Sequence, residues 1–278
     1  MTSTTDFDPL EVAIRPAATV MLVDDRPDLN VLMVRRTARV VFAPDTWVFP
    51  GGRVDPEDHA ADFDAMFAGL TDDKASQLLE VDQGGLAWWL AACRETLEEA
   101  GLLLASKRID SEQIHQWRDA VRADESAFAD LLLEYGQQLD ATALEEVARF
   151  ITPLGAPRRF DARFFVAAAP EGQEPHHDDG EIVDWTWIAP REALKQWSAG
   201  TFEMMTPTIR MLACLERYPT ADAVMRAARQ RLPYRRVRVV DPDGAYKVVL
   251  PGEAGYETAD LEVESGWVRL WENSAEAD

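Results

Sequence analysis

The sequence has few cysteines, few basic residues and no long apolar run. Two cysteines among 278 residues are too few for a disulfide framework, and the apolar neighbours of Cys93 and Cys214 indicate buried thiols rather than metal ligands. No apolar run reaches the length of about 18 residues that a membrane span requires. Residues 1–6 contain neither a basic region nor an apolar segment for export. We therefore expect a cytoplasmic protein without a membrane partner.

Basic residues are outnumbered by acidic ones, with 28 Lys and Arg against 50 Asp and Glu and a formal charge of −22. Proteins bind DNA and RNA through basic surfaces, so this balance excludes a nucleic-acid polymer as partner. A small phosphate compound stays compatible with it where metal cations or local arginines offset the repulsion. With 47% hydrophobic residues, the chain can build one large domain or two small ones. The sequence does not indicate an oligomeric state.

Three carboxylates fall on one turn of an expected helix. At about 100° per residue, Glu98 lies about 60° to one side of Glu95 and Glu99 about 40° to the other, so all three share one arc. Clustered carboxylate oxygens are the ligands that hard cations such as Mg²⁺ or Mn²⁺ require. Gly101 suits the end of this helix. Its opposite face is apolar and predicts packing against a core through Leu86, Leu90, Cys93 and Leu97.

A second segment, residues 47–55, has the form of a strand that enters a tight turn at two adjacent glycines, Gly51 and Gly52. Together with the acidic helix it resembles the signature of the Nudix hydrolases, G-x5-E-x7-R-E-U-x-E-E-x-G-U, where U is a bulky aliphatic residue. The residues that match its second half are Arg94, Glu95, Glu98, Glu99, Gly101 and Leu102.

The first half of the signature differs in two ways. Asp58 stands where the signature has Glu, and 35 residues separate it from Arg94, where the signature has seven. An insertion at a loop costs little closure entropy, so the turn and the helix can still meet. The side chain of Asp58 is one methylene shorter than that of Glu. It either still reaches the metal site or has been moved away by the insertion, and we expect the second.

An interrupted signature of this kind resembles the branch of the family that includes peroxisomal coenzyme A diphosphatases. Further stretches support this placement at residues 32–36 before 49–52, at 151–153 followed by 157–165, and at 181–187. The resemblance implies an α/β fold of the Nudix type, an α/β/α sandwich with a mixed sheet, helical insertions and a C-terminal β segment.

The expected organisation is a Nudix domain over residues 1–232, with a helical insertion at about 58–85 and extra helices at about 110–149. Residues 233–278 form a β-rich appendage. Periodicity and turn signals predict strands at 17–23, 30–35, 164–168, 183–188, 237–240 and 246–250. They predict helices at 111–122, 125–136, 141–149, 193–197, 206–215 and 220–231.

The resemblance implies that water hydrolyses a nucleoside diphosphate linked to another moiety, such as coenzyme A or a derivative, with Mg²⁺ or Mn²⁺ as cofactor. It implies metal ligands from Glu95, Glu98, Glu99 and the carbonyl of Gly51, one carboxylate helping to deprotonate the water. Arg94 would orient Glu98, and Glu181 is a candidate for a further metal-binding carboxylate. The candidates for contacts with the substrate are Arg36, Arg39, Gly52, Arg158 and Arg159.

One alternative function and one possible further metal site stay open. A catalytically inactive Nudix-fold module that binds or senses a nucleotide would explain Asp58 and the insertion, although the intact acidic turn argues against it. Separately, residues 174–180 hold His176 and His177 among acidic residues. This composition suits either a transition-metal site or an acidic turn between two strands.

Overall fold

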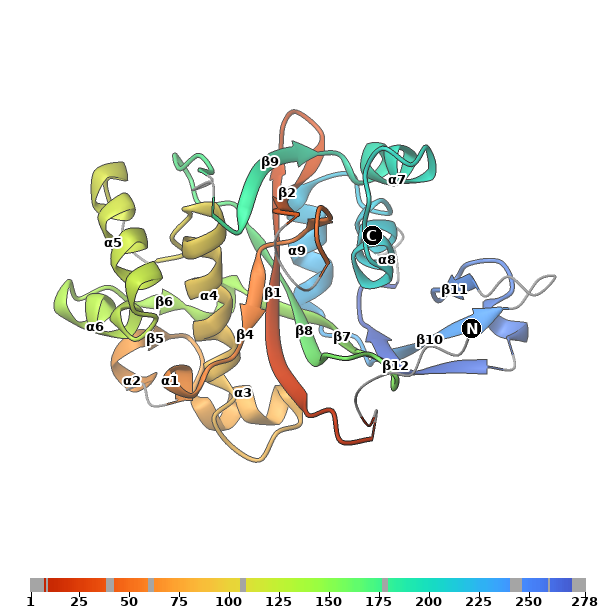
Figure 1. Ribbon diagram of the computed structural model, residues 1–278, viewed down its shortest axis with the longest axis horizontal. Helices are drawn as coiled ribbons and strands as arrows, with labels where there is room; N and C mark the ends of the chain where they lie inside the picture. Colours follow the sequence, from red (N-terminus) through yellow and green to blue (C-terminus); the bar gives the residue numbers. More distant parts are fainter. Residues whose placement is uncertain are drawn as a thin grey trace.

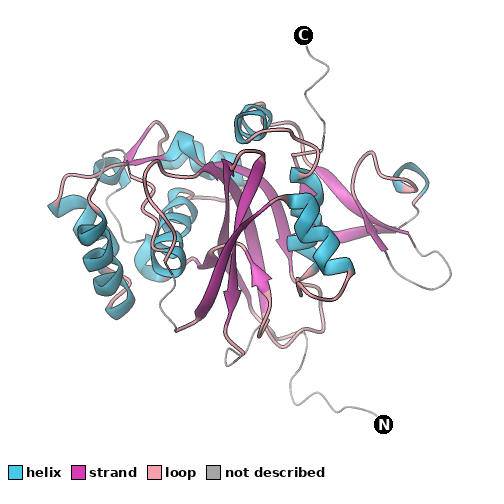
Figure 2. Cartoon of the chain, turned by 90° about the horizontal axis from the view of Figure 1, so that it is seen from above, coloured by secondary structure: helices cyan, strands magenta, loops and turns pink. Residues whose placement is uncertain are grey.

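The structure, a computed structural model, describes residues 8, 10–38, 43–59, 63–105, 109–176, 180–240, 247–259 and 261–271, apart from the side chains of residues 64 and 261–265. A large mixed sheet stands at the centre, with helices on both of its faces (Figures 1 and 2). This arrangement confirms the expected α/β/α sandwich. Among the described residues, no helix is long and apolar enough to cross a bilayer.

The strands are β1 (Ile14–Asp25), β2 (Leu29–Arg36), β3 (Trp47–Val48), β4 (Gly51–Arg53), β5 (Phe67–Ala68), β6 (Leu139–Asp140), β7 (Glu145–Ile151), β8 (Arg159–Ala168), β9 (Ile182–Ile188), β10 (Arg235–Val240), β11 (Lys247–Val249) and β12 (Leu261–Val268). The α-helices are α1 (Pro56–His59), α2 (Phe63–Met66), α3 (Asp72–Leu79), α4 (Leu86–Ala100), α5 (Ser111–Ala123), α6 (Ala127–Glu134), α7 (Pro190–Ser198), α8 (Thr206–Leu215) and α9 (Ala221–Arg229). The 3₁₀ turns are η1 (Ala141–Ala143) and η3 (Tyr256–Thr258).

The large sheet has the order β11-β10-β12-β7-β8-β1-β2-β3, with β4 paired to β1 and β9 paired to β2. β1 and β8 run parallel, whereas β1 pairs antiparallel with both β2 and β4. The pairing of β4 with β1 places the glycine turn at the centre of the sheet.

Strand β1 is buried on both faces because helices cover both sides of the sheet. Its apolar residues alternate between two cores, with Val20 and Leu22 in the core on the side of α4 and Met21 and Val23 in the core on the side of α8 and α9. A continuous apolar run is what a strand covered on both faces requires. The strand predicted at residues 17–23 is therefore confirmed as part of β1.

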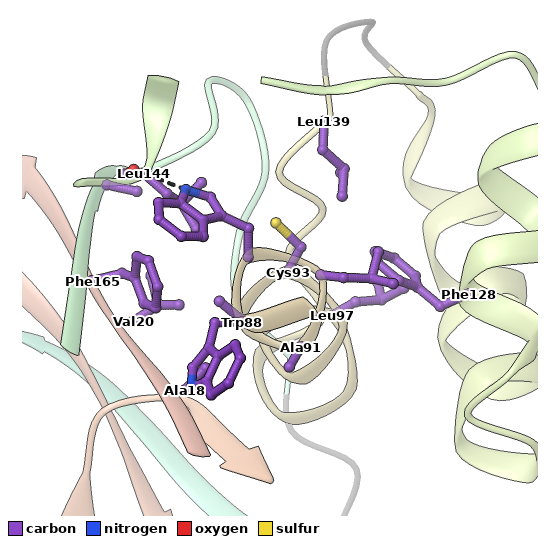
Figure 3. Packing of buried hydrophobic residues seen from close by; sticks show 14 of the residues in the cluster. Ala18, Val20, Trp88, Ala91, Cys93, Leu97, Phe128, Leu139, Leu144 and Phe165 are labelled. Carbon is purple, nitrogen blue, oxygen red and sulfur yellow. Dashed lines mark hydrogen bonds between the residues drawn. The ribbon is translucent and has the colours of Figure 1, made fainter. Parts of the chain in front are cut away.

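Helix α4 carries the acidic turn and packs its apolar face against the sheet. Figure 3 shows it between Val20 and Phe165 of the sheet and Phe128 of α6. The helix ends as expected, because Gly101 adopts a φ of 68° and its N–H donates to the carbonyl of Leu97 at 2.9 Å. This left-handed cap satisfies a carbonyl that the helix leaves unpaired.

The insertion is folded back onto the body of the protein. It contains α2, the short strand β5 and α3, and β5 pairs in parallel with β6. Helix α2 ends at Met66, and β5 begins at the next residue, Phe67. Met66 and Leu79 are fully buried in the core that α4 shares, so the insertion extends this core rather than forming a separate unit.

The prediction of a helix at residues 141–149 is wrong. Residues 141–149 form η1 and most of β7 instead of a helix. Leu144, Val147, Ala148 and Ile151 have helical spacing, which favours a helix when the segment is considered alone. Pairing of β7 with β8 on one side and β12 on the other overrides this local preference.

The C-terminal segment is β-rich and continues the main sheet through the pairing of β12 with β7. A buried ion cluster helps to hold it. Glu146 of β7 accepts a hydrogen bond from the Tyr234 hydroxyl and lies 3.5 Å from Nε of Arg269 and 3.7 Å from a terminal nitrogen of Arg163. Burial raises the pKa of Glu146 to about 7, although these three partners oppose the shift. The domain division at residue 232 stays a prediction.

We predict that Trp89→Phe destabilises the fold. Trp89 is 1% exposed, and its indole N–H lies 3.0 Å from the carbonyl of Ala141 and 3.2 Å from that of Leu144. The smaller ring leaves both a cavity and unmatched carbonyls, so the free energy of unfolding should fall by about 2–4 kcal/mol. Urea denaturation measures the loss. Trp197→Phe, at a residue that is 38% exposed, should change it by less than about 0.5 kcal/mol; equal losses would contradict the prediction.

Candidate active site

The guanidinium of Arg94 stands at the centre of the site. Its Nε and one terminal nitrogen donate to the two carboxylate oxygens of Asp58 at 3.1 and 3.0 Å. Its other terminal nitrogen donates to Glu95 at 3.0 Å and to Glu98 at 2.8 Å, and a further bond reaches the carbonyl of Arg53. Arg94 is only 1% exposed. Burial alone would lower the pKa of Arg94, but the bonds to Asp58 and the charge of Glu95 raise it.

The expectation that the insertion moves Asp58 away is wrong. Asp58 is 3% exposed, and besides its two bonds to Arg94 it accepts the N–H of Asp55 at 2.8 Å. The insertion therefore begins and ends at neighbouring positions in space. The two halves of the signature meet through the ion pair between Asp58 and Arg94. The contact of Asp58 is with Arg94, so its role is to position the arginine that holds Glu95 and Glu98.

The two glycines bring backbone against the carboxylates. Gly51 has a φ of 156°, and a Cβ there would lie 2.4 Å from the carbonyl oxygen of Ala18. Its N–H donates to Glu99 at 2.8 Å. A Cβ on Gly52 would lie 2.3 Å from a carboxylate oxygen of Glu95. Only residues without side chains allow this close approach between the turn and α4.

Arg36 joins Glu99 to Glu181. One terminal nitrogen of Arg36 lies 3.6 Å from Glu99 and the other lies 3.6 Å from Glu181. The backbone supports this arrangement, since the N–H of Thr37 donates to the carbonyl of Glu181 at 2.7 Å. Residues from β2, from the acidic turn of α4 and from the segment before β9 thus meet at one place, which brings Glu181 to the site.

Burial makes the three carboxylates hard to ionise. It raises the pKa of Glu99 to about 7, against the opposing effects of Arg36 and the N–H of Gly51. The pKa of Glu95 is raised well above its usual range by burial, which Arg94 opposes and Glu99 reinforces. The pKa of Glu98 is also raised by burial. The site therefore favours the approach of positive charge.

The remaining arginines lie apart from the carboxylates or cannot be placed. Arg39 is outside the described residues. Arg159 pairs with Ile14 at the start of β1, whereas Gly52 pairs with Ala18, four residues further along the same strand and thus about 13 Å away. The Nε of Arg159 donates to the carbonyl of Thr152. In the described part of the chain, neither Arg158 nor Arg159 forms an ion pair with a carboxylate of the site. Their contact with substrate stays a prediction.

Two contributors were not identified from the sequence. Asp55 lies 3.3 Å from Arg94, and its place in the glycine turn was the available signal. Arg118 of α5 is 5% exposed and donates to the carbonyls of Glu98 and Glu99 at 2.9 and 3.4 Å. It thereby satisfies carbonyls at the C-terminal end of α4. Since Arg118 is 19 residues from Glu99 in sequence, no local pattern announces this contact.

The carboxylates supply the oxygen ligands that Mg²⁺ and Mn²⁺ prefer. Among the residues that the structure describes, however, no three acidic, cysteine or histidine side chains converge as a preformed metal site. The reason is visible in the ion pairs, because Arg94 engages Glu95 and Glu98 while Arg36 engages Glu99.

Comparisons with known proteins agree on one family. A family model described as "NUDT19 Nudix domain" matches residues 72–215. The chain is 26% identical over 305 residues to the acyl-coenzyme A diphosphatase NUDT19 of Gallus gallus, a match that covers 87% of this chain and 79% of that protein. With the protein of the same name from Homo sapiens it shares 28% identity over 207 residues, covering 60% of this chain and only 55% of that protein.

Among solved structures, the chain is similar to the crystal structure of a NUDIX hydrolase from Alicyclobacillus acidocaldarius. The two are 29% identical with a TM-score of 0.62, and the match covers 78% of this chain and 97% of the other. The likeness therefore includes nearly all of that bacterial protein.

We predict that Asp58→Asn lowers the free energy of unfolding by about 3–5 kcal/mol, because it leaves the buried guanidinium of Arg94 without its main counter-charge. Chemical denaturation measures the loss. The matched control is Asp222→Asn, which removes an exposed partner of Arg226 and should cost less than about 1 kcal/mol. A loss at Asp58 no larger than at Asp222 would show that the ion pair does not organise the site.

Proposed function

The chain belongs to the Nudix hydrolase family described as the NUDT19 Nudix domain, and we propose that its substrate is coenzyme A or an acyl derivative of it. As a Nudix hydrolase it cleaves a nucleoside diphosphate linked to another moiety. The observation that carries the proposal is that Arg94 binds Glu95, Glu98 and the carbonyl of Arg53 in the glycine turn, while Glu99 accepts the N–H of Gly51. The coenzyme A part rests on what the names of the relatives say they cleave.

The proposed cofactor is Mg²⁺ or Mn²⁺, held by Glu95, Glu98 and Glu99, with Glu181 and the carbonyl of Gly51 as further oxygen ligands. The donor set fits such a hard cation, and three neighbouring carboxylates disfavour their own ionisation without one. When bound, the cation offsets the negative charge of the diphosphate and of the developing leaving group. Binding requires Glu95 and Glu98 to exchange contacts with Arg94 for contacts with the cation.

The residues of the chain have separate tasks in this scheme. One of the three carboxylates accepts the proton of the attacking water, whose oxygen forms the new bond to phosphorus as the phosphoanhydride bond breaks. Each product then keeps one phosphate. Asp58 fixes Arg94, and Arg94 positions Glu95 and Glu98 before the cation binds; neither residue contacts the substrate. Arg36, freed from Glu99, supplies a cation for the substrate oxygens.

Selectivity for the moiety attached to the diphosphate must come from residues outside the carboxylate cluster, because the diphosphate is common to every candidate substrate. We propose that the insertion between Asp58 and Arg94 and the segment at Arg158 and Arg159 make these contacts. Gly52 and Arg39 remain further candidates. The cytoplasmic location expected from the sequence stays a prediction.

We predict that Glu98→Gln lowers kcat by a factor on the order of 10²–10⁴, since loss of one carboxylate weakens the electrostatic stabilisation of the transition state. The amide keeps an acceptor for Arg94, so the unfolding temperature should change little. Release of phosphate from the products by a coupled phosphatase, with Mg²⁺ or Mn²⁺ present, measures turnover. Glu192→Gln, at a partly exposed position on α7, is the control and should retain full activity. Normal turnover by folded Glu98→Gln would refute the assignment.

A second prediction tests the substrate. Coenzyme A carries a 3′-phosphate that would require an arginine contact in a protein of charge −22. The analogue without this phosphate should have a lower kcat/KM, and Arg158→Ala or Arg159→Ala should remove the difference. Arg191→Ala, whose side chain is 84% exposed on α7, should preserve it. Equal cleavage of both compounds by the unmodified enzyme would exclude recognition of the 3′-phosphate and leave a general nucleoside diphosphate hydrolase.

A further inference from the structure

Two histidines from distant parts of the chain face each other beside the C-terminal end of α4. His115 lies on α5 and His176 lies in the segment between β8 and β9. Their ring centres are 4.9 Å apart, and the ring planes are inclined by 35°. Both residues are exposed, so an ion from solvent has access to them. The carboxylate site makes no use of this pair.

Hydrogen bonds fix the tautomer of both rings. Nδ1 of His115 lies 2.5 Å from the carbonyl oxygen of Ser111, and Nδ1 of His176 lies 2.6 Å from that of Pro175. A carbonyl oxygen can only accept, so each neutral ring carries its hydrogen on Nδ1 and keeps a lone pair on Nε2. Within the described residues, no hydrogen bond to either Nε2 is present.

This is the arrangement that metal-binding histidines adopt. A histidine ligand usually donates its second ring N–H to a backbone carbonyl, which fixes the ring and leaves the other nitrogen for the ion. An ion about 2 Å from a ring nitrogen is about 3 Å from the ring centre, so two imidazoles on one tetrahedral ion have centres about 5 Å apart. The observed separation of 4.9 Å agrees with such sharing.

We propose that His115 and His176 bind one transition-metal cation of the Zn²⁺, Cu²⁺ or Ni²⁺ type through their Nε2 atoms, with water completing the coordination. Imidazole nitrogen selects these ions, whereas Mg²⁺ and Mn²⁺ prefer the oxygen ligands of the carboxylate cluster. The net charge of −22 raises the local concentration of cations near the protein. The proposal is independent of the substrate.

A bound ion would connect two segments that both contact α4. On one side, Arg118 of α5 donates to the carbonyls of Glu98 and Glu99. On the other side, the N–H of His176 donates to the carbonyl of Ala100 at 2.9 Å. The ion would therefore cross-link both segments around the end of the catalytic helix and stabilise the folded state by mass action.

The test is Zn²⁺ binding by calorimetry on the full chain, with excess Mg²⁺ present to occupy the carboxylate cluster. The expected result is one Zn²⁺ per chain. His115→Ala and His176→Ala should each weaken Zn²⁺ binding by about 10-fold or more. Even the loss of a residue that only supports a ligand weakens metal binding by about 10–100-fold, and the loss of a ligand itself should cost at least as much. His59→Ala is the matched control, since His59 contacts Trp88 elsewhere in the fold and should leave binding unchanged.

A second measurement identifies the ligands directly. The paramagnetic resonance spectrum of the Cu²⁺-loaded chain should show coupling to two imidazole nitrogens, reduced to one in either variant. Circular dichroism without metal confirms that the variants are folded. Unchanged Zn²⁺ affinity in both variants, an equal loss in His59→Ala, or displacement of Zn²⁺ by Mg²⁺ would each overturn the proposal.

Discussion

The buried guanidinium of Arg94 is the interaction on which the site depends. It has five N–H donors in a rigid plane, and they engage the carboxylates of Asp58, Glu95 and Glu98 and the carbonyl of Arg53. These partners come from α1, β4 and α4. A single side chain thus connects the glycine turn, the start of the insertion and helix α4, and it does so where almost no water reaches.

The same arrangement explains how a strongly acidic chain tolerates carboxylates at low exposure. Arg94 and Arg36 supply positive charge to Glu95, Glu98 and Glu99, so each of the three carboxylates has a positive partner within the protein. Burial still raises the pKa of all three. In the proposed mechanism, binding of a divalent cation would exchange one positive partner for another, and Arg36, released from Glu99, would become available to phosphate oxygens.

Local patterns predicted the parts of the site that lie on one element. The acidic arc of α4, its stop at Gly101 and the glycine turn are each specified by neighbouring residues. Contacts between distant segments were not accessible in this way: Asp58 was expected to lie apart because its partner is 36 residues away, and the carbonyl contacts of Arg118 leave no sequence signal. The helix predicted at residues 141–149 was wrong for a related reason, because the strand formed there depends on pairing with β8 and β12.

The ion pair between Asp58 and Arg94 also separates the length of the connecting chain from the chemistry of the site. Lengthening a loop from about 7 to about 35 residues costs about 1.4 kcal/mol in closure entropy. Breaking a buried ion pair costs about 3–5 kcal/mol, so the pair outweighs the longer loop. The ion pair therefore leaves the length of the connection between Asp58 and Arg94 only weakly constrained, whereas buried residues within it, such as Met66 and Leu79, stay constrained by the core. The contact between Asp58 and Arg94, rather than the number of residues between them, is what holds the two halves of the signature together.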